Sequence, residues 1–153
     1  MNKYALENIY DKEIFRDIDI ALARLLTRLA PDDPPGVRLA ALLVSRASSE
    51  GHVCIDLHQW AGQTIRRPDG RSTMMQCPDT KDWIDQLRSS AMVSGSAANC
   101  PLVCDARGRV YLQRLYQHEQ QLARLLQKRA IDTSPEIAYE SQKRIRTFLN
   151  RYF

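Results

Sequence analysis

Apolar residues recur every three or four positions in the first part of the chain, from about Asp11 to Ala30. This period predicts an amphipathic helix, and one face of it would carry Ile14, Phe15, Ile18, Leu22, Leu25, Leu26 and Leu29. The prolines of the PDDPP segment end this helix, because proline cannot continue one. A second helix is predicted from Val37 to Ala47, with Pro35 in its first turn and Asp33 as a candidate cap. It is apolar on nearly every side, which is typical of the central helix of a domain.

The period changes to two after Gly51, where the chain must turn. Between His52 and Leu57 the apolar positions alternate with polar ones, which predicts a half-buried strand with Val53, Ile55 and Leu57 on one side. We expect a short helix over residues 58–65. The Pro-Asp-Gly turn chemistry of the RRPDGRSTMMQCPD segment then predicts a loop from Arg66 to Asp79.

The second half of the chain is predicted to hold another short helix, a hairpin and two more helices. Asp79 or Thr80 would cap the short helix, which turns Trp83, Ile84 and Leu87 inward. After a loop over residues 93–100, strands at residues 102–104 and 109–112 flank Asp-Ala-Arg-Gly, with Gly108 at a positive φ. The next helix covers about residues 114–130 and presents Leu115, Leu122, Leu125 and Leu126. The last begins at Thr133-Ser134-Pro135-Glu136 and aligns Ile137, Ser141, Ile145, Phe148, Leu149 and Tyr152.

The order helix, strand, helix, helix, hairpin between Val37 and Leu112 is that of a winged helix. We therefore predict a mainly α (α+β) fold: a helical domain with a winged-helix-like core and a small antiparallel sheet. The 153 residues are the size of one domain, and a chain of this length buries roughly 68–70% of its unfolded surface. The apolar end at Tyr152-Phe153 leads us to expect that the chain is part of something longer, because native termini are usually polar and loose.

Composition and charge exclude a membrane-spanning helix but leave several classes of partner open. The net charge is +4, which is compatible with nucleic acid nearby without requiring it. Apolar runs are far shorter than the ~20 residues that span a bilayer, so no membrane partner is expected. The first residues lack the apolar core of a signal peptide. We expect a cytoplasmic protein whose four cysteines, Cys54, Cys77, Cys100 and Cys104, stay reduced.

Candidate chemistry is sparse. The six glycines are scattered and none precedes Gly-Lys-Ser/Thr, so no phosphate-binding loop is present and this chain alone should not hydrolyse ATP. Zinc is a minor alternative, because Cys100 and Cys104 form the one pair with suitable spacing and no second pair follows. A nucleophilic pair of Cys54 with His58 or His118 lacks a recognisable oxyanion site. We predict no catalytic, cofactor or metal site, and name five arginines that could contact phosphates: Arg66, Arg67, Arg71, Arg107 and Arg109.

Two blocks of sequence resemble the N-terminal domain of RecD, the alpha subunit of exodeoxyribonuclease V, the RecBCD helicase–nuclease. In the first, Leu39-Ala-Ala-Leu-Leu-Val44 runs into Glu50, Gly51, His52, Val53 and Cys54, then Leu57. The second is Pro101-Leu-Val103, Arg109-Val-Tyr111-Leu112, Arg114, Tyr116 and Glu119, then residues 122–126. The resemblance spans roughly residues 15–126, and the arginine loop and TMMQ stretch match nothing in it.

The resemblance implies a function that the residues themselves do not show. A full-length subunit of this kind would be an ATP-dependent 5′–3′ DNA helicase in double-strand-break repair and recombination, with ATP and Mg²⁺ bound by helicase domains that follow this region. The N-terminal domain would dock against the RecC-type subunit, with DNA in the parent complex. The alternative, from the order of elements and the arginines, is a winged-helix DNA-binding module.

Overall fold

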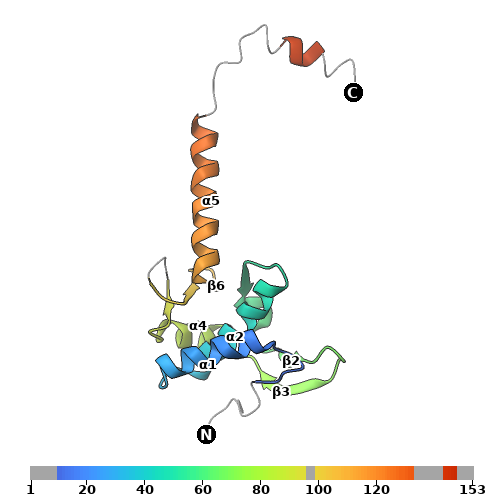
Figure 1. The fold of residues 1–153 in the computed structure, drawn as a ribbon, viewed down its shortest axis with the longest axis vertical. Helices are drawn as coiled ribbons and strands as arrows, with labels where there is room; N and C mark the ends of the chain where they lie inside the picture. The colour runs from blue at the N-terminus through green and yellow to red at the C-terminus, as the bar shows by residue number, and fades with distance from the viewer. Residues whose placement is uncertain (1–9, 96–98, 133–142, 148–153) are drawn as a thin grey trace. The chain divides into compact units, whose positions relative to one another are not determined.

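The computed structural model of the chain describes residues 10–95, 99–132 and 143–147 (Figure 1). The chain divides into two units, residues 1–118 and residues 119–153. The first unit holds the sheets and helices α1 to α4. Helix α5, Gln113–Asp132, begins in the first unit and continues into the second.

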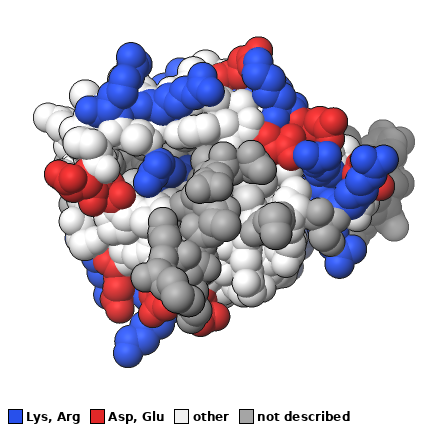
Figure 2. Space-filling view, turned by 90° about the horizontal axis from the view of Figure 1, so that it is seen from below, with Lys and Arg blue, Asp and Glu red and all other residues white. Residues whose placement is uncertain are grey.

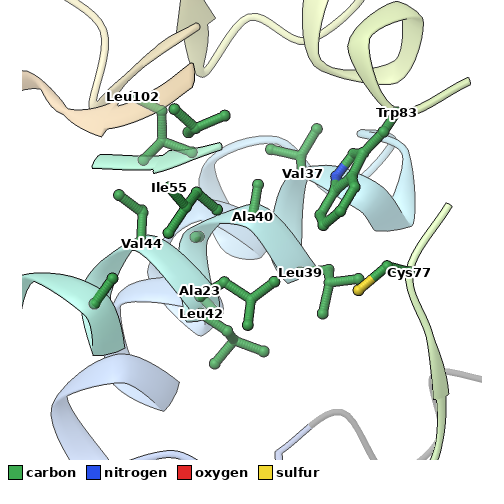
Figure 3. Packing of buried hydrophobic residues seen from close by; sticks show 14 of the residues in the cluster. Ala23, Val37, Leu39, Ala40, Leu42, Val44, Ile55, Cys77, Trp83 and Leu102 are labelled. Atoms are coloured by element: carbon green, nitrogen blue, oxygen red, sulfur yellow. The ribbon is translucent and has the colours of Figure 1, made fainter. Parts of the chain in front are cut away.

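Helix α2, Pro35–Ser49, is the centre of the first unit. Ten of its residues are buried, from Gly36 to Ala47, so the prediction of a central helix that is apolar on nearly every side is confirmed. It packs against α1, against α4 and against strands β1 and β6. In Figure 3, Val44 and Ala40 lie toward Ile55 and Leu102, whereas Leu42 lies toward Ala23. The helix therefore separates α1 on one side from the sheet on the other.

Helix α1, Asp17–Leu29, forms the outer layer over α2. The predicted start at Asp11 was wrong, because residues 11–15 form a turn in which the Phe15 N–H donates to the Asp11 carbonyl at 2.9 Å. The predicted face was also partly wrong. Its members Ile14, Phe15 and Leu26 are buried and Leu22 is half-buried, whereas Ile18, Leu25 and Leu29 are exposed.

The inner face of α1 carries a buried acid, Asp19, whereas Leu25 and Leu29 lie on the outer face. The Asp19 side chain is fully buried and lies beside Ile20, Ala23 and Leu26 in the inward row. Its carboxylate accepts hydrogen bonds from the Ser45 hydroxyl of α2 at 2.5 Å and from the backbone N–H of Arg16 at 2.9 Å. These bonds satisfy a charged group that would otherwise be costly to bury, and they fix the rotation of α1 on α2.

The main sheet has the strand order β1-β6-β5-β4. Strands β1 (Cys54–Asp56), β6 (Arg109–Leu112) and β5 (Leu102–Cys104) pair antiparallel, and β4 (Val93–Ser94) pairs parallel to β5. The predicted β5–β6 hairpin is confirmed, with Gly108 at φ +75°. The strand predicted over residues 52–57 is shorter, since Val53 is exposed and Leu57 begins helix α3. The loop predicted over residues 93–100 contains β4.

A second, two-stranded sheet replaces most of the loop predicted from Arg66 to Asp79. Strands β2 (Thr64–Arg66) and β3 (Ser72–Gln76) pair antiparallel, with Gly70 at φ +84° in the turn between them. The Pro-Asp-Gly turn chemistry was therefore correct, but it joins two strands. Helix α3 is only Leu57–Trp60, shorter than the helix predicted over residues 58–65, because β2 begins at Thr64.

Helix α4, Thr80–Arg88, supports the start of α2. Trp83 is fully buried, and its indole Nε1 donates to the Gly36 carbonyl at 2.9 Å, while the Gly36 N–H donates to Gln86 Oε1 at 2.9 Å. Asp79 is the N-cap as predicted, although its side chain makes no cap hydrogen bond. Asp33 does not cap α2: Pro34 holds that position, and the Asp33 carboxylate accepts from the Ser90 hydroxyl.

The α+β class is confirmed, with helices around a small sheet. The winged-helix core stays a prediction, although β1, β6 and β5 are adjacent in that order. The predicted helix at about residues 114–130 is confirmed as α5, on which Leu122, Leu125 and Leu126 are exposed. The predicted start of the last helix at residues 133–136 lies outside the described residues. Residues 143–147 are helical.

Candidate functional site

Three of the five candidate arginines lie on the β2–β3 hairpin. Arg67 is held by two acids, with one guanidinium nitrogen 2.8 Å from Asp11 Oδ2 and another 3.0 Å from Glu13 Oε2. The pKa of Asp11 is lowered, chiefly by the backbone N–H of Glu13 and also by Arg67, which outweigh the opposing effect of desolvation. Arg71 pairs with Asp69 at 3.2 Å in the turn. Arg66 is exposed and has no ion pair with any described residue.

The other two arginines lie at the β5–β6 turn, where a single carboxylate organises the loop. Asp105 accepts from the backbone N–H groups of Arg107 at 2.9 Å and Arg109 at 3.0 Å. It also accepts from the Arg109 guanidinium through two nitrogens, each at 2.7 Å. Desolvation alone would raise the pKa of Asp105, but these hydrogen bonds outweigh it and lower the pKa. Arg109 also stacks over Tyr111, 5.6 Å from the ring centroid.

The candidate arginines therefore do not form one cluster of free positive charge. They belong to two different sheets, and Arg67, Arg71 and Arg109 are each paired with an acid. On the face drawn in Figure 2, basic side chains lie in separate groups, several of them next to acidic ones. Of the five candidate arginines, Arg66 and Arg107 are exposed and have no ion pair with a described residue.

The two sequence blocks that resemble RecD meet in the main sheet. Cys54 of β1 lies opposite Tyr111 of β6, and Asp56 lies opposite Arg109. Before β1, Gly51 has φ +91°, a conformation that favours glycine, and thereby ends α2 and turns the chain into the strand. Glu50 pairs with Arg46 at 2.9 Å on the last turn of α2. His52, Val53 and Arg114 are exposed, whereas Tyr111 is buried and Leu112 is half-buried. These residues build the junction of helix and sheet.

All four cysteines are free thiols. Burial raises the pKa of Cys77 to about 12, and burial together with the neighbouring Asp105 raises the pKa of Cys104. A thiol with a raised pKa is a weak nucleophile at neutral pH, because the thiolate is the reactive form. Within residues 10–95, 99–132 and 143–147, no three His, Cys, Asp or Glu side chains lie together in a way that could hold a metal ion.

The outer face of α1 is a surface that the sequence reasoning missed. Ile18, Leu25 and Leu29 are exposed there, next to a hollow of about 510 Å³ lined by Tyr10, Ala21, Arg24, Thr27 and Arg28. The sequence contained a pattern that could have revealed this exposed face. Asp19 and Ala23 share the inward row with Leu26, so the leucine-rich row and the inward row are two different stripes of one helix.

Comparison with known proteins decides the family. The family model described as RecBCD enzyme subunit RecD, N-terminal domain, matches residues 11–111, from the turn before α1 to the end of the β1–β6 pairing. The chain belongs to the RecD N-terminal domain family. The resemblance drawn from the two blocks is thereby confirmed. The chain is also 34% identical over 110 residues to the RecBCD enzyme subunit RecD of Mycolicibacterium smegmatis.

That alignment covers 72% of this chain but only 18% of the mycobacterial subunit, so the chain spans about a fifth of its relative's length. The RecD-type match includes α1, α2, both sheets and α4, and stops before α5. The surfaces of these matched elements are therefore where a function of the RecD N-terminal domain should be sought. Among the described residues, no helix is both long and apolar enough to cross a membrane.

Proposed function

We propose that this chain is a docking domain through which a RecD-type subunit is held in a RecBCD-like complex, chiefly against the RecC-type subunit. The full-length subunit would act as an ATP-dependent 5′–3′ DNA helicase of exodeoxyribonuclease V, in double-strand-break repair and recombination in the cytoplasm. The observation that carries the proposal is the family match over residues 11–111.

The helicase chemistry is assigned to a part of the subunit that this chain does not include. The residues present do not fit ATP and Mg²⁺, because none of the six glycines precedes Gly-Lys-Ser/Thr. The candidate arginines offer little free charge, since Arg67, Arg71 and Arg109 are each paired with an acid. Both points favour a protein partner over a nucleotide as the ligand of this domain.

Binding of the purified chain to the cognate RecC-type subunit tests the proposal. A stable complex should bury at least ~1,000 Å² and be measurable by calorimetry at micromolar concentrations. The full-length RecD-type subunit serves as the positive control. Binding by the full-length subunit together with none by this chain would refute the docking role.

The winged-helix DNA-binding module is kept as a second candidate, because Arg66 and Arg107 are exposed and unpaired among the described residues. A phosphate-binding surface predicts affinity for duplex DNA that falls as the salt concentration rises. With two free arginines the slope of log K against log salt should be no steeper than about −2. No measurable binding at low salt, or binding that an Arg66→Glu/Arg107→Glu variant retains in full, would contradict this reading.

A further inference from the structure

Helix α1 presents an apolar stripe to solvent along its whole length. Ile18, Leu25 and Leu29 have exposed fractions of 64%, 43% and 59%. Their spacing of seven and four residues puts them on one side of an α-helix. The half-buried Leu22 lies between them on the same side. Exposed leucines and isoleucines in a continuous stripe mark an interaction site more often than a free surface.

The rotation of α1 is fixed, so this stripe is a built feature of the outer surface. Asp19, fully buried, is hydrogen-bonded to Ser45 of α2 at 2.5 Å, and Ala23 and Leu26 on the same inward side belong to the core. Turning the stripe toward α2 would expose Ala23 and Leu26 and break the bond to Ser45. Helix α1 therefore cannot turn its stripe toward α2 without losing its existing core contacts.

A row of positive charge runs beside the stripe. Arg24 and Arg28 are exposed and lie one turn apart, and neither has an ion pair with a described residue. The Arg24 guanidinium lies over the Tyr10 ring, 4.9 Å from its centroid. Both arginines line the hollow of about 510 Å³, which a side chain from a partner could enter.

We propose that this face of α1 is the surface through which the domain docks, and that its occupant is an amphipathic helix of the partner subunit with acidic side chains along one flank. The inference rests on the docking function proposed above. Two helices pack by placing the ridges of one into the grooves of the other, so the stripe would receive apolar side chains. Carboxylates on the flank would enter the hollow between Arg24 and Arg28, because opposite charges across an interface fix its register.

A second copy of this chain fits the face less well. Two α1 faces brought together would oppose Arg24 and Arg28 to the same residues of the other copy. The exposed leucines of α5 are interleaved with Arg124 and Lys128, so that helix would also bring positive charge to positive charge. Like charges at an interface disfavour association. The charge of this face therefore favours an acidic partner over a second copy of the chain.

The test measures binding of the chain and of three variants to the purified RecC-type subunit. Ile18→Glu/Leu29→Glu places charge on the stripe and should weaken binding at least about thirtyfold, as loss of central apolar contacts does. Arg24→Glu/Arg28→Glu should weaken it about tenfold and reduce its salt dependence. The matched control is Leu122→Glu/Leu126→Glu, since these leucines of α5 are each 57% exposed. It should stay within about twofold of the unsubstituted chain.

Thermal unfolding confirms that each variant is folded, which is expected because every substituted side chain is exposed. If the unsubstituted chain binds and the α1 variants bind equally well, the docking function stands and the assignment to α1 is wrong. If only the α5 control loses binding, the surface lies on α5 and the assignment to α1 is again wrong. If the unsubstituted chain itself does not bind, the docking function fails and the assignment fails with it. Self-association that Ile18→Glu/Leu29→Glu abolishes, without a loss of partner binding, would identify a second copy as the occupant and overturn the inference.

Discussion

Ser45→Ala is the substitution that tests most directly how α1 is held on the domain. Ser45 is the one polar side chain among the buried residues of α2, and it donates to the buried Asp19 carboxylate at 2.5 Å. Removing the hydroxyl leaves Asp19 with the backbone N–H of Arg16 at 2.9 Å and a guanidinium nitrogen of Arg16 at 3.9 Å. The second of these is long and belongs to a side chain that is 58% exposed, so it compensates little.

The expected loss of stability follows from the charge on the acceptor. A hydrogen bond to a charged group contributes about 1.5–3 kcal/mol, and a buried carboxylate that loses a donor falls toward the upper end of that range. We therefore expect Ser45→Ala to lower the free energy of unfolding by about 2–3 kcal/mol. For a chain of 153 residues the corresponding fall in melting temperature is roughly 2–4 °C for each kcal/mol.

Urea unfolding followed by circular dichroism measures the difference, with Ser49→Ala as the matched control. Ser49 lies one turn later on α2 and donates only to the Ser45 carbonyl at 3.2 Å, so its loss should cost about 0.5 kcal/mol or less. A double-mutant cycle with Asp19→Ala should give a coupling energy of about 1–3 kcal/mol. If Ser45→Ala costs no more than Ser49→Ala, the bond to Asp19 does not hold α1, and the rotation argued for that helix loses its main support.

Three further changes test the turns and the α2–α4 contact. Asp105→Asn should destabilise the protein by about 1–3 kcal/mol at pH 7, because two backbone N–H groups and a guanidinium lose a charged acceptor. Since the folded-state pKa of Asp105 is depressed, its contribution is present above its unfolded pKa of about 3.9 and is lost as the pH falls through the folded value. The difference between the urea midpoints of the two proteins should therefore begin to shrink below about pH 4 and keep shrinking as the pH falls further, and a constant difference would contradict the assignment. Gly108→Ala should cost more than Gly51→Ala in the same assay: both have positive φ, but a Cβ at residue 108 would lie 3.2 and 3.3 Å from two side-chain atoms, and one at residue 51 would meet nothing within 4 Å. Trp83→Phe leaves the Gly36 carbonyl without its indole donor and should lower the free energy of unfolding by about 1–3 kcal/mol, and an unchanged urea midpoint would show that this bond is dispensable.

The sequence predicted the structure correctly where a local pattern of residues determines the backbone conformation. Helix α2 was predicted because its apolar residues surround the axis, and the β5–β6 turn because Gly108 can adopt a positive φ that other residues avoid. The resemblance to RecD was equally local. It depended on Gly51 and on residues of β1 and β6, which the fold brings together.

The predictions failed where contacts distant in sequence decide the structure. The β2–β3 hairpin has short strands with many polar positions, and it is anchored by bonds such as Arg67 to Asp11, 56 residues away. Alternation alone could not reveal such a pairing. On α1, counting apolar residues placed Ile18, Leu25 and Leu29 on the inward face and left Asp19 out of it, because a buried carboxylate is rare in a protein core. The Asp19–Ser45 pair connects residues 26 positions apart, and no local rule anticipates it.

The use of charge in this domain is the strongest physical argument for a protein ligand. Two of the arginines near its turns are paired with acids of the same chain: Arg109 forms an ion pair with Asp105, and Arg67 forms one with Asp11. Exposed arginines also remain on α1, where Arg24 and Arg28 lie beside an exposed apolar stripe. A phosphate backbone binds arginines and makes no favourable contact with leucines, whereas an amphipathic protein helix can contact both. Ile18→Glu/Leu29→Glu and Arg66→Glu/Arg107→Glu therefore separate the two ligands. The first pair should weaken partner binding at least about thirtyfold and leave any DNA binding intact, and the second pair should weaken DNA binding and leave partner binding intact.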